Sequence, residues 1–222
     1  MDKKNIRVFF EKKDRAIYIS HLDLLRTMQR ALKRSGLPVW YSEGFNPRIY
    51  LNFPLALSLG TEGVKEPMDM AVVEEVSLEE IAERLNGACP EGIRIINAAY
   101  PVHPNKDIGF AEYETFFSGD TEALKAALDG YISQESIKVM KHSKRKGMIE
   151  VDIKPHINIL SISGCDNGLK AGYRLPAGLE LNLNSAVLTD SFLEYCNSRG
   201  IKAELRCAKR TNIFCADGAI FE

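Results

Sequence analysis

The sequence predicts an α+β protein made of two ferredoxin-like halves in tandem, each with the element order βαββαβ. Three features predict this fold: helices that start at capping residues between β-rich segments, a linker with two prolines near the middle of the chain, and a second half that repeats the element order of the first. The chain has 222 residues, of which 45% are hydrophobic, enough for two domains of roughly 100 residues with cores of their own. We expect an N-terminal domain over residues 1–103 and a C-terminal domain over residues 108–222.

The first half opens with β-forming residues and then turns helical. Residues 6–10 predict a strand, and residues 16–19 predict that the extended pattern resumes after a turn. Ser20, followed three residues later by a carboxylate, fits a capping box and predicts the start of a helix. Gly36 and Pro38 end that helix. Four apolar side chains recur at helical spacing and are expected to face the core: Leu22, Leu25, Met28 and Leu32.

Short strands and one more helix complete the first half. The extended segments are residues 39–41, 49–53, 68–73 and 93–98. Loops are expected at residues 42–48, where Gly and Asn-Pro favour turns, and at residues 54–67. A second Ser-x-x-Glu box, at Ser77, predicts the helix that precedes the closing strand.

The second half follows a linker with Pro101 and Pro104. Its apolar patterns predict helices at residues 121–131 and 191–197. A basic turn, Lys144-Arg145-Lys146-Gly147, is expected to join two strands in a hairpin, and its tip is either an RNA contact or a solvated hairpin end. The extended segments of this half are residues 113–117, 137–141, 148–153, 157–163, 169–175, 179–183 and 201–207.

Composition excludes several classes of protein. The formal net charge is -1, with 29 basic and 30 acidic residues, so any nucleic-acid binding has to come from a local patch. No apolar run approaches the roughly 20 residues of a membrane helix, and no signal-peptide core follows the first lysines. We therefore expect a cytoplasmic protein with no membrane partner.

The cysteines predict neither a disulfide framework nor a metal centre. They are five in number, widely spaced, and no two form Cys-x-x-Cys. Reduced, mostly buried thiols are the expected state, with no metal and no cofactor bound. The five residues are Cys89, Cys165, Cys196, Cys207 and Cys215.

The most specific motifs lie between residues 17 and 63. Residues 18–24 (YISHLDL), 41–48 (YSEGFNPR) and 54–63 (PLALSLGTEG), with the arginines between the first two, resemble the radical-SAM-associated domain of unknown function. Residues 152–155 and 209–211 resemble its second half less closely. Members of that family are stand-alone proteins or C-terminal extensions of cobalamin-binding radical SAM enzymes, and many lie beside genes for ribonuclease and ribosomal proteins. The resemblance implies a radical SAM protein as partner and an RNA context, and it supplies no catalytic mechanism.

The first candidate site is the basic face of the first helix. Arg26, Arg30, Lys33 and Arg34 share that face, where they can follow the phosphate backbone of an RNA. The solvated charged face that any amphipathic helix needs explains these residues equally well.

The second candidate site is the loop over residues 41–48. Tyr41 and Phe45 offer rings for base stacking, Arg48 offers a phosphate contact, and Gly44 permits close backbone approach. A structural turn whose aromatic side chains fill the core is nearly as consistent with these residues, but the length of the loop favours a function.

The sequence supports a binding module better than an enzyme. His21 is the one candidate for catalysis, as a general base, although a structural histidine at a helix start is the simpler interpretation. The main hypothesis is an accessory protein that binds RNA or a radical SAM partner and has no catalysis of its own. The alternative is a metal-independent RNA-processing endonuclease with His21 at its site, an analogy to the enzymes that process CRISPR repeats and one that rests on architecture alone. A third possibility is that the chain completes or regulates the active site of the radical SAM enzyme.

Overall fold

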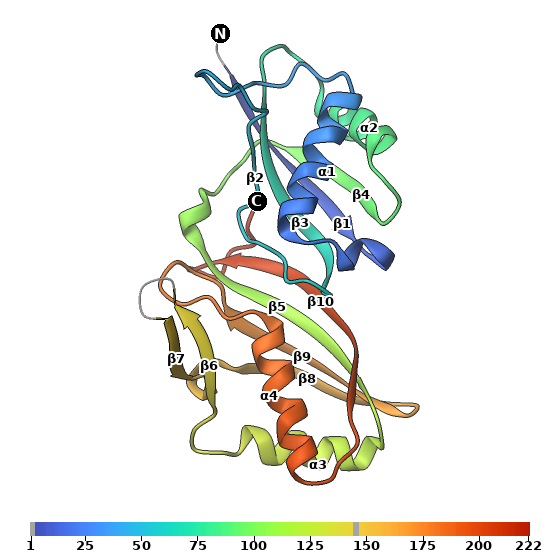
Figure 1. Cartoon of the computed structure of the whole chain (residues 1–222), viewed down its shortest axis with the longest axis vertical. Helices are drawn as coiled ribbons and strands as arrows, with labels where there is room; N and C mark the ends of the chain where they lie inside the picture. The colour runs from blue at the N-terminus through green and yellow to red at the C-terminus, as the bar shows by residue number, and fades with distance from the viewer. Residues whose placement is uncertain (1–2, 144–146) are drawn as a thin grey trace. The chain divides into compact units, whose positions relative to one another are not determined.

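The computed structural model describes residues 3–143 and 147–222 and confirms a mixed α+β protein (Figure 1). The predicted basic turn at Lys144-Arg145-Lys146 lies outside the described residues. The chain divides into two compact units, one formed by residues 1–109 with 210–222 and the other by residues 110–209. No helix among the described residues is long and apolar enough to cross a membrane.

The first unit places two helices on an antiparallel sheet. Its strands lie in the order β4-β1-β3-β2, and each pairs antiparallel with its neighbour. The end of β10 (Glu204–Cys215), from Arg210 on, belongs to this unit as well. The elements in chain order are β1 (Lys4–Lys12), α1 (His21–Arg34), β2 (Leu51–Asn52), β3 (Glu62–Val72), α2 (Leu78–Ala88) and β4 (Ile93–Ala99).

Helix α1 forms where its capping residues predict it. The Ser20 hydroxyl accepts a hydrogen bond from the Asp23 backbone N–H at 3.1 Å, which satisfies one of the free donors of the first turn. Beyond the last turn, Gly36 adopts a φ of +66°, which glycine tolerates best. Met28 and Leu32 are fully buried in the core between the helices and the sheet. Residue Leu22 was expected in the core and is instead 63% exposed, because the predicted apolar stripe is wider than the face that touches the sheet.

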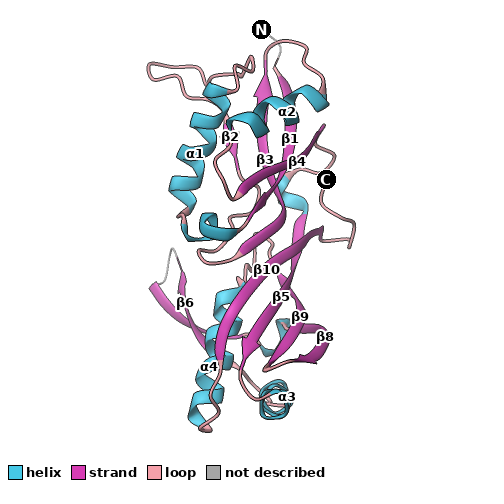
Figure 2. Cartoon of the chain, turned by 90° about the vertical axis from the view of Figure 1, so that its right-hand side faces the viewer, coloured by secondary structure: helices cyan, strands magenta, loops and turns pink. Residues whose placement is uncertain are grey.

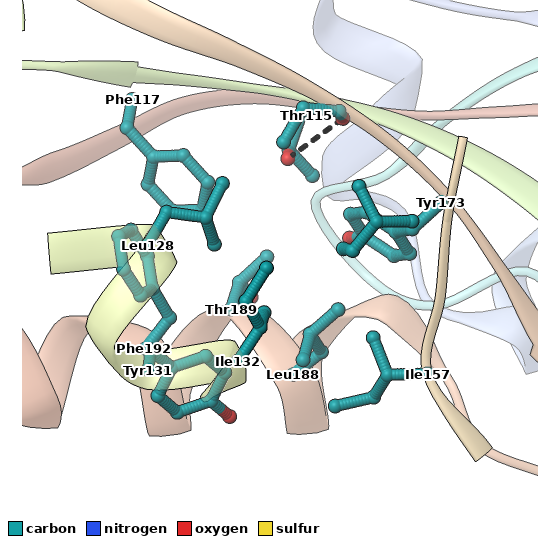
Figure 3. A pocket seen from close by; sticks show the side chains of 12 residues that line it. Thr115, Phe117, Leu128, Tyr131, Ile132, Ile157, Tyr173, Leu188, Thr189 and Phe192 are labelled. Carbon is teal, nitrogen blue, oxygen red and sulfur yellow. Dashed lines mark hydrogen bonds between the residues drawn. The ribbon is translucent and has the colours of Figure 1, made fainter. Parts of the chain in front are cut away.

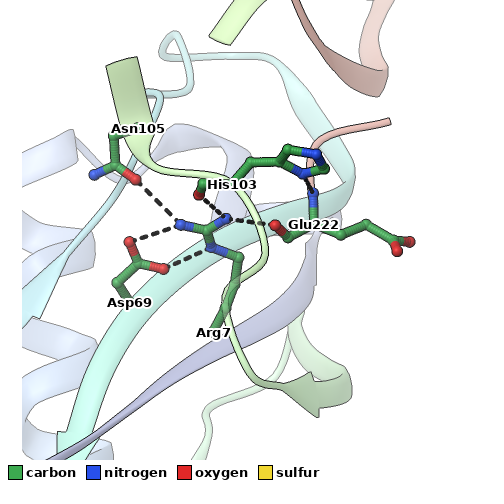
Figure 4. Close-up of polar contacts among 5 residues, drawn as sticks. All are labelled: Arg7, Asp69, His103, Asn105 and Glu222. Carbon is green, nitrogen blue, oxygen red and sulfur yellow. Dashed lines mark hydrogen bonds and ion pairs between the residues drawn. The ribbon is translucent and has the colours of Figure 1, made fainter. Parts of the chain in front are cut away.

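The sheet face away from the helices carries a buried arginine (Figure 4). The Arg7 guanidinium donates to both carboxylate oxygens of Asp69, at 2.7 and 3.1 Å. It also donates to the carbonyls of His103 and Glu222, at 2.9 and 3.0 Å, and to the Asn105 amide oxygen at 3.2 Å. One side chain thus holds the linker and the last residues of the chain against β1 and β3.

The second unit repeats the arrangement of two helices on a sheet. Its main strands lie in the order β10-β5-β9-β8, with α3 and α4 packed together against them (Figure 2). Strands β6 and β7 form a separate hairpin, as predicted. The remaining elements are β5 (Ile108–Ser118), α3 (Thr121–Ile132), β6 (Lys138–Ser143), β7 (Gly147–Asp152), β8 (Asn158–Cys165), β9 (Gly168–Pro176) and α4 (Ser185–Ser198).

A small apolar cavity lies between helices α3 and α4 and the sheet of the second unit (Figure 3). Its volume of about 20 Å³ holds roughly one water molecule. Sites for small organic ligands are larger, about 300–1,000 Å³, so this cavity is a packing gap and not a candidate site. Its walls include Thr115, Phe117, Leu128, Tyr131, Tyr173 and Phe192.

Several predicted elements are wrong in type or extent. Residues 14–18 form a short 3-10 helix where a turn and then an extended segment at residues 16–19 were predicted, because Ile19 N–H bonds back to the Ala16 carbonyl. Strand β3 begins at Glu62, inside the predicted loop, and α4 begins at Ser185, six residues before the predicted start. Residues 39–41 and 179–183 contribute isolated bridges instead of strands.

Candidate nucleic-acid interface

A groove in the first unit runs between α1 and the segment that contains residues 41–49. We call it the first groove. It has a volume of about 430 Å³ and is open to solvent. It brings together five residues that the sequence singled out from two separate motifs. Arg26, Arg30 and Lys33 come from the helix, and Tyr41 and Arg48 come from the loop. All residues that line it are Leu22, Leu25, Arg26, Gln29, Arg30, Lys33, Tyr41, Pro47, Arg48 and Ile49.

Hydrogen bonds across its base fix the loop at the groove. Ser42 N–H donates to the Arg48 carbonyl at 2.7 Å, and Arg48 N–H donates to the Ser42 hydroxyl at 3.0 Å. Tyr41 and Ile49 form an isolated antiparallel bridge next to them, and the Ile49 side chain is buried. Tyr41 and Arg48 therefore stand on a closed, anchored base, opposite the side chains of α1.

The tip of the same loop lies outside the groove lining. Gly44 has a φ of +122° and open space around it, which explains why glycine occupies this turn position. Phe45 is fully exposed and plugs no core, in contrast to the structural interpretation of the loop. An exposed phenylalanine beside a groove is an unpartnered ring that a ligand can cover.

The first groove concentrates positive charge. Four of its lining side chains are cationic, and none is a carboxylate. Arg26 shares its charge with Asp23, whose carboxylate lies 3.2 Å away. Arg30, Lys33 and Arg48 form no ion pair within the described part of the chain. A chain of almost zero net charge thus carries a local positive field that attracts an anion.

Arg34 lies on the other side of α1. Its Nη2 donates to the carbonyl of Ala88, at the end of α2, at 2.6 Å. An α-helix advances about 100° per residue, so Arg34 stands roughly 80° around the axis from Arg26. The sequence placed both residues on one face of the helix. In the structure Arg26 lines the first groove, whereas Arg34 lies next to the end of α2.

His21 packs against a phenylalanine outside the first groove. Its ring contacts the Phe53 ring edge-on, with centroids 5.4 Å apart, and it does not line the groove. Residues 3–143 and 147–222 contain no group of three or more His, Cys, Asp or Glu side chains that could hold a metal ion.

Two lining residues were not among the candidate site residues, although their helical spacing indicates that they lie on the groove side of α1. Gln29 follows Arg26 by three residues and precedes Lys33 by four, which puts its amide on the groove side of α1. Leu22 precedes Arg26 by four residues and exposes an apolar surface next to the cations. The groove is therefore lined by guanidinium and amide groups together with apolar and aromatic surface.

Comparison with protein families finds one model, described as "uncharacterized protein conserved in bacteria (DUF2344)", which matches residues 5–190. The matched range includes every residue that lines the first groove. A comparison with curated protein sequences finds no significant match.

Proposed function

We propose that this chain, which belongs to the DUF2344 family of conserved bacterial proteins, is an RNA-binding accessory protein with no catalysis of its own. The observation that carries the proposal is the composition of the first groove: four cationic side chains, one exposed tyrosine and no carboxylate. Phosphate is the anion that such a set binds best, because a guanidinium can donate to two phosphate oxygens at once and an ammonium adds a compact charge.

A single RNA strand fits this groove better than a duplex. Arg26, Arg30 and Arg48 can each bind a phosphodiester through two N–H groups, and Lys33 adds a point charge. Tyr41, on the opposite wall, offers its ring for stacking on an unpaired base, an interaction worth about 1–3 kcal/mol per base. A duplex hides its base faces and leaves the tyrosine without a role.

The partner and the wider fold are part of the proposal. The resemblance of residues 17–63 to the radical-SAM-associated domain supports a radical SAM protein as the enzyme that this chain assists in the cytoplasm. The strand orders β4-β1-β3-β2 and β10-β5-β9-β8, each with two helices on the sheet, support two ferredoxin-like halves in tandem. In that arrangement the first half binds RNA, and the second half is free for the partner protein.

The endonuclease alternative has no comparable support. Its candidate base, His21, packs against Phe53 and lies outside the groove lining. Cleavage without a metal needs a second group to stabilise the developing charge, and the cations that could supply it line a groove that His21 does not line.

RNA binding across a salt series tests the proposal. The purified protein is titrated into labelled total RNA fragments and into labelled single-stranded oligonucleotides at about 50, 100 and 200 mM salt. The triple variant Arg26→Ala/Arg30→Ala/Arg48→Ala is compared with Arg94→Ala as a matched control. Arg94 is an exposed arginine of the same unit whose position in β4 points to the sheet face away from α1.

Salt-sensitive binding by the wild type and by Arg94→Ala is expected, with a loss in the triple variant. Each phosphate contact on a single strand contributes about -0.7 to the slope of log K against log salt. The loss of three contacts should therefore make the slope shallower by roughly 2. Absence of binding at about 50 mM salt would overturn the proposal and leave the radical SAM protein as the ligand to test. Shortened RNA on a denaturing gel, lost in His21→Ala, would favour the endonuclease instead.

A further inference from the structure

A second groove lies on the other side of α1, within the same unit. Its volume is about 390 Å³, close to that of the first groove. Arg30 lines both grooves, so they meet at this residue on the exposed surface of the helix. The second groove is lined by Arg15, Ala16, Ile19, Thr27, Arg30, Arg34, Pro90, Glu91 and Ile93.

The second groove is also dominated by positive charge. Three of its side chains are arginines and one is a carboxylate, that of Glu91. Arg15, Arg30 and Arg34 are all exposed, and no ion pair neutralises them in the described part of the chain. Arg34 uses one Nη for the Ala88 carbonyl, which leaves its other N–H groups for a ligand.

The helical positions of these residues explain how one helix serves two grooves. With about 100° per residue, Lys33 stands close to Arg26 around the axis, Arg30 about 40° away and Arg34 about 80° away. Lys33 and Arg26 therefore face the first groove and Arg34 faces the second, with Arg30 between them. The cations of the two grooves, which meet at Arg30, form a band across α1 from Arg48 to Arg15.

We propose that one single-stranded RNA crosses α1 at Arg30 and occupies both grooves, so that the ligand is an oligonucleotide and not a mononucleotide or a terminal phosphate. The inference rests on the proposed function and adds the length and path of the ligand. A mononucleotide occupies only the first groove, so the arginines of the second groove beyond Arg30 would contact no part of it.

The dimensions of the helix set a minimum length for the strand. An α-helix with its side chains is about 10–12 Å across, and a stacked strand advances about 3.4 Å per nucleotide. Crossing α1 therefore takes about three or four nucleotides. With at least one more nucleotide in each groove, a complete ligand has roughly six.

The experiment combines ligand length with groove-specific variants. Uridine oligonucleotides of about two and about eight nucleotides compete with a labelled octamer for the full-length protein at about 50 mM salt. Arg48→Ala removes a contact of the first groove, Arg15→Ala one of the second, and Arg94→Ala is the control outside both. An acidic peptide with about eight glutamates is the competing polyanion without bases.

The expected result is a dependence on length that differs between the variants. Arg15→Ala weakens the octamer by about fivefold, a typical loss for one arginine–phosphate contact at low salt, and leaves the dinucleotide unchanged. Arg48→Ala weakens both ligands, and Arg94→Ala weakens neither. The glutamate peptide competes poorly, because it has no bases for Tyr41.

Two outcomes would overturn the inference while the proposed function survives. One is an octamer that binds Arg15→Ala as well as wild type while Arg48→Ala binds it weakly, which confines the ligand to the first groove. The other is equal affinity for dinucleotide and octamer.

A glutamate peptide that competes as well as the RNA, with the same loss in Arg15→Ala, would make the band a site for an acidic protein segment. If no oligonucleotide of either length binds, the proposed function itself is wrong.

Discussion

Arg210 and Glu66, 144 positions apart in the sequence, form an ion pair that is almost completely buried. Arg210 Nε donates to the Glu66 carboxylate at 3.0 Å, and its two Nη groups donate to the carbonyls of Ala56 and Leu55, at 3.0 and 2.8 Å. One guanidinium thus joins the end of β10, strand β3 and the segment that follows Pro54. The guanidinium is buried inside one unit, where water cannot replace a lost partner.

Substitution of Glu66 by glutamine is expected to destabilise the protein strongly. The change leaves the Arg210 charge buried without a counter-ion, which typically costs about 3–5 kcal/mol. Urea unfolding followed by circular dichroism measures the loss. The matched control is Glu11→Gln, since Glu11 pairs with Arg94 and Lys13 at the surface, where a pair contributes about 0–1 kcal/mol.

Replacement of both partners separates the charge from the packing. In Glu66→Met/Arg210→Met the Arg210 charge is removed together with its counter-ion, so part of the stability lost in Glu66→Gln is expected to return. Equal losses in Glu66→Gln and Glu11→Gln would show that the buried pair contributes no more than a surface pair.

Lys12 gives a prediction with a pH dependence. Its side chain is 1% exposed and reaches the carbonyls of Ile17 and Ile19 only through long hydrogen bonds of 3.4 Å. Burial lowers the pKa of Lys12 from 10.5, in spite of the attraction of the Glu66 charge, and the Arg210 charge lowers it further. The folded protein therefore binds the Lys12 proton more weakly than the unfolded chain does.

Lys12→Met is expected to be more stable than the wild type at pH 7, by about 1 kcal/mol or more, because an apolar side chain of similar length replaces a buried charge. Stability rises with pH wherever the unfolded state binds more protons, here between the lowered pKa and 10.5. The difference between variant and wild type should therefore shrink as the pH rises toward 10.5. Urea unfolding at several pH values checks this, with the exposed neighbour Lys13→Met as control. A stability difference between Lys12→Met and wild type that grows with pH would contradict the lowered pKa of Lys12.

Local signals predicted the parts of the fold that depend on local chemistry. Ser20 and Ser77 each cap a helix through a backbone N–H three residues on, so the sequence located α1 and α2 well. The short helix at residues 14–18 depends on tertiary contacts instead. Lys12 is buried beside it, and Gly60 N–H bonds to the Ile17 carbonyl from a distant loop. No local pattern reports such contacts, and the β-forming residues favoured a strand.

Helix α4 was only partly predicted, because its buried face is partly polar. Ser185 and Thr189 are both about 1% exposed, and polar residues weaken the apolar period that marks a helix. The Ser185 hydroxyl is satisfied in the core by the Tyr173 hydroxyl, 2.8 Å away. Strand β3 was shortened in the prediction for a similar reason, since Gly63 and Pro67 are typical of loops and here lie in a strand.

Most cations of the two grooves were named from the sequence, but their division between two grooves was not. Spacing alone placed Arg26, Arg30 and Arg34 on one face, and only the neighbouring elements decide where that face is split. The loop closed by Ser42 and Arg48 makes the wall of the first groove, and residues 15–19 with residues 90–93 make the wall of the second. Both walls are tertiary contacts, so the sequence alone predicts a basic face and not two grooves.

Cys89 is expected to react slowly with alkylating agents. It lies at the C-terminal end of α2, and burial raises the pKa of its thiol to about 11. Since only the thiolate reacts, at pH 8 it should react about two hundredfold more slowly than an ordinary thiol of pKa about 8.5 with equal access. Iodoacetamide labelling followed by mass spectrometry measures the order of reaction, and labelling in urea is the control that should make all five cysteines alike. Cys89 as the fastest site in the folded protein would contradict the expectation.

Asp23→Asn is expected to strengthen RNA binding. The Asp23 carboxylate lies 3.2 Å from Arg26 and accepts a hydrogen bond from the Ser20 hydroxyl at 2.7 Å. The bond from Ser20, followed by the contact with Arg26, holds the pKa of Asp23 below its usual value, so the carboxylate is charged at neutral pH. Its removal frees Arg26 for a phosphate and takes a negative charge away from the first groove, for an expected gain of about two- to threefold in affinity at low salt.

The same change in the second unit is a matched control. Glu122 pairs with Lys125 at 2.8 Å with the same spacing of three residues in a helix, and neither residue lines either groove. Glu122→Gln changes the net charge by the same amount and should leave RNA affinity as it is. If both variants bind more tightly by the same factor, net charge accounts for the gain. A gain confined to Asp23→Asn, and absent when Arg26 is alanine, attributes it to the freed guanidinium, because the two substitutions are then coupled through one contact.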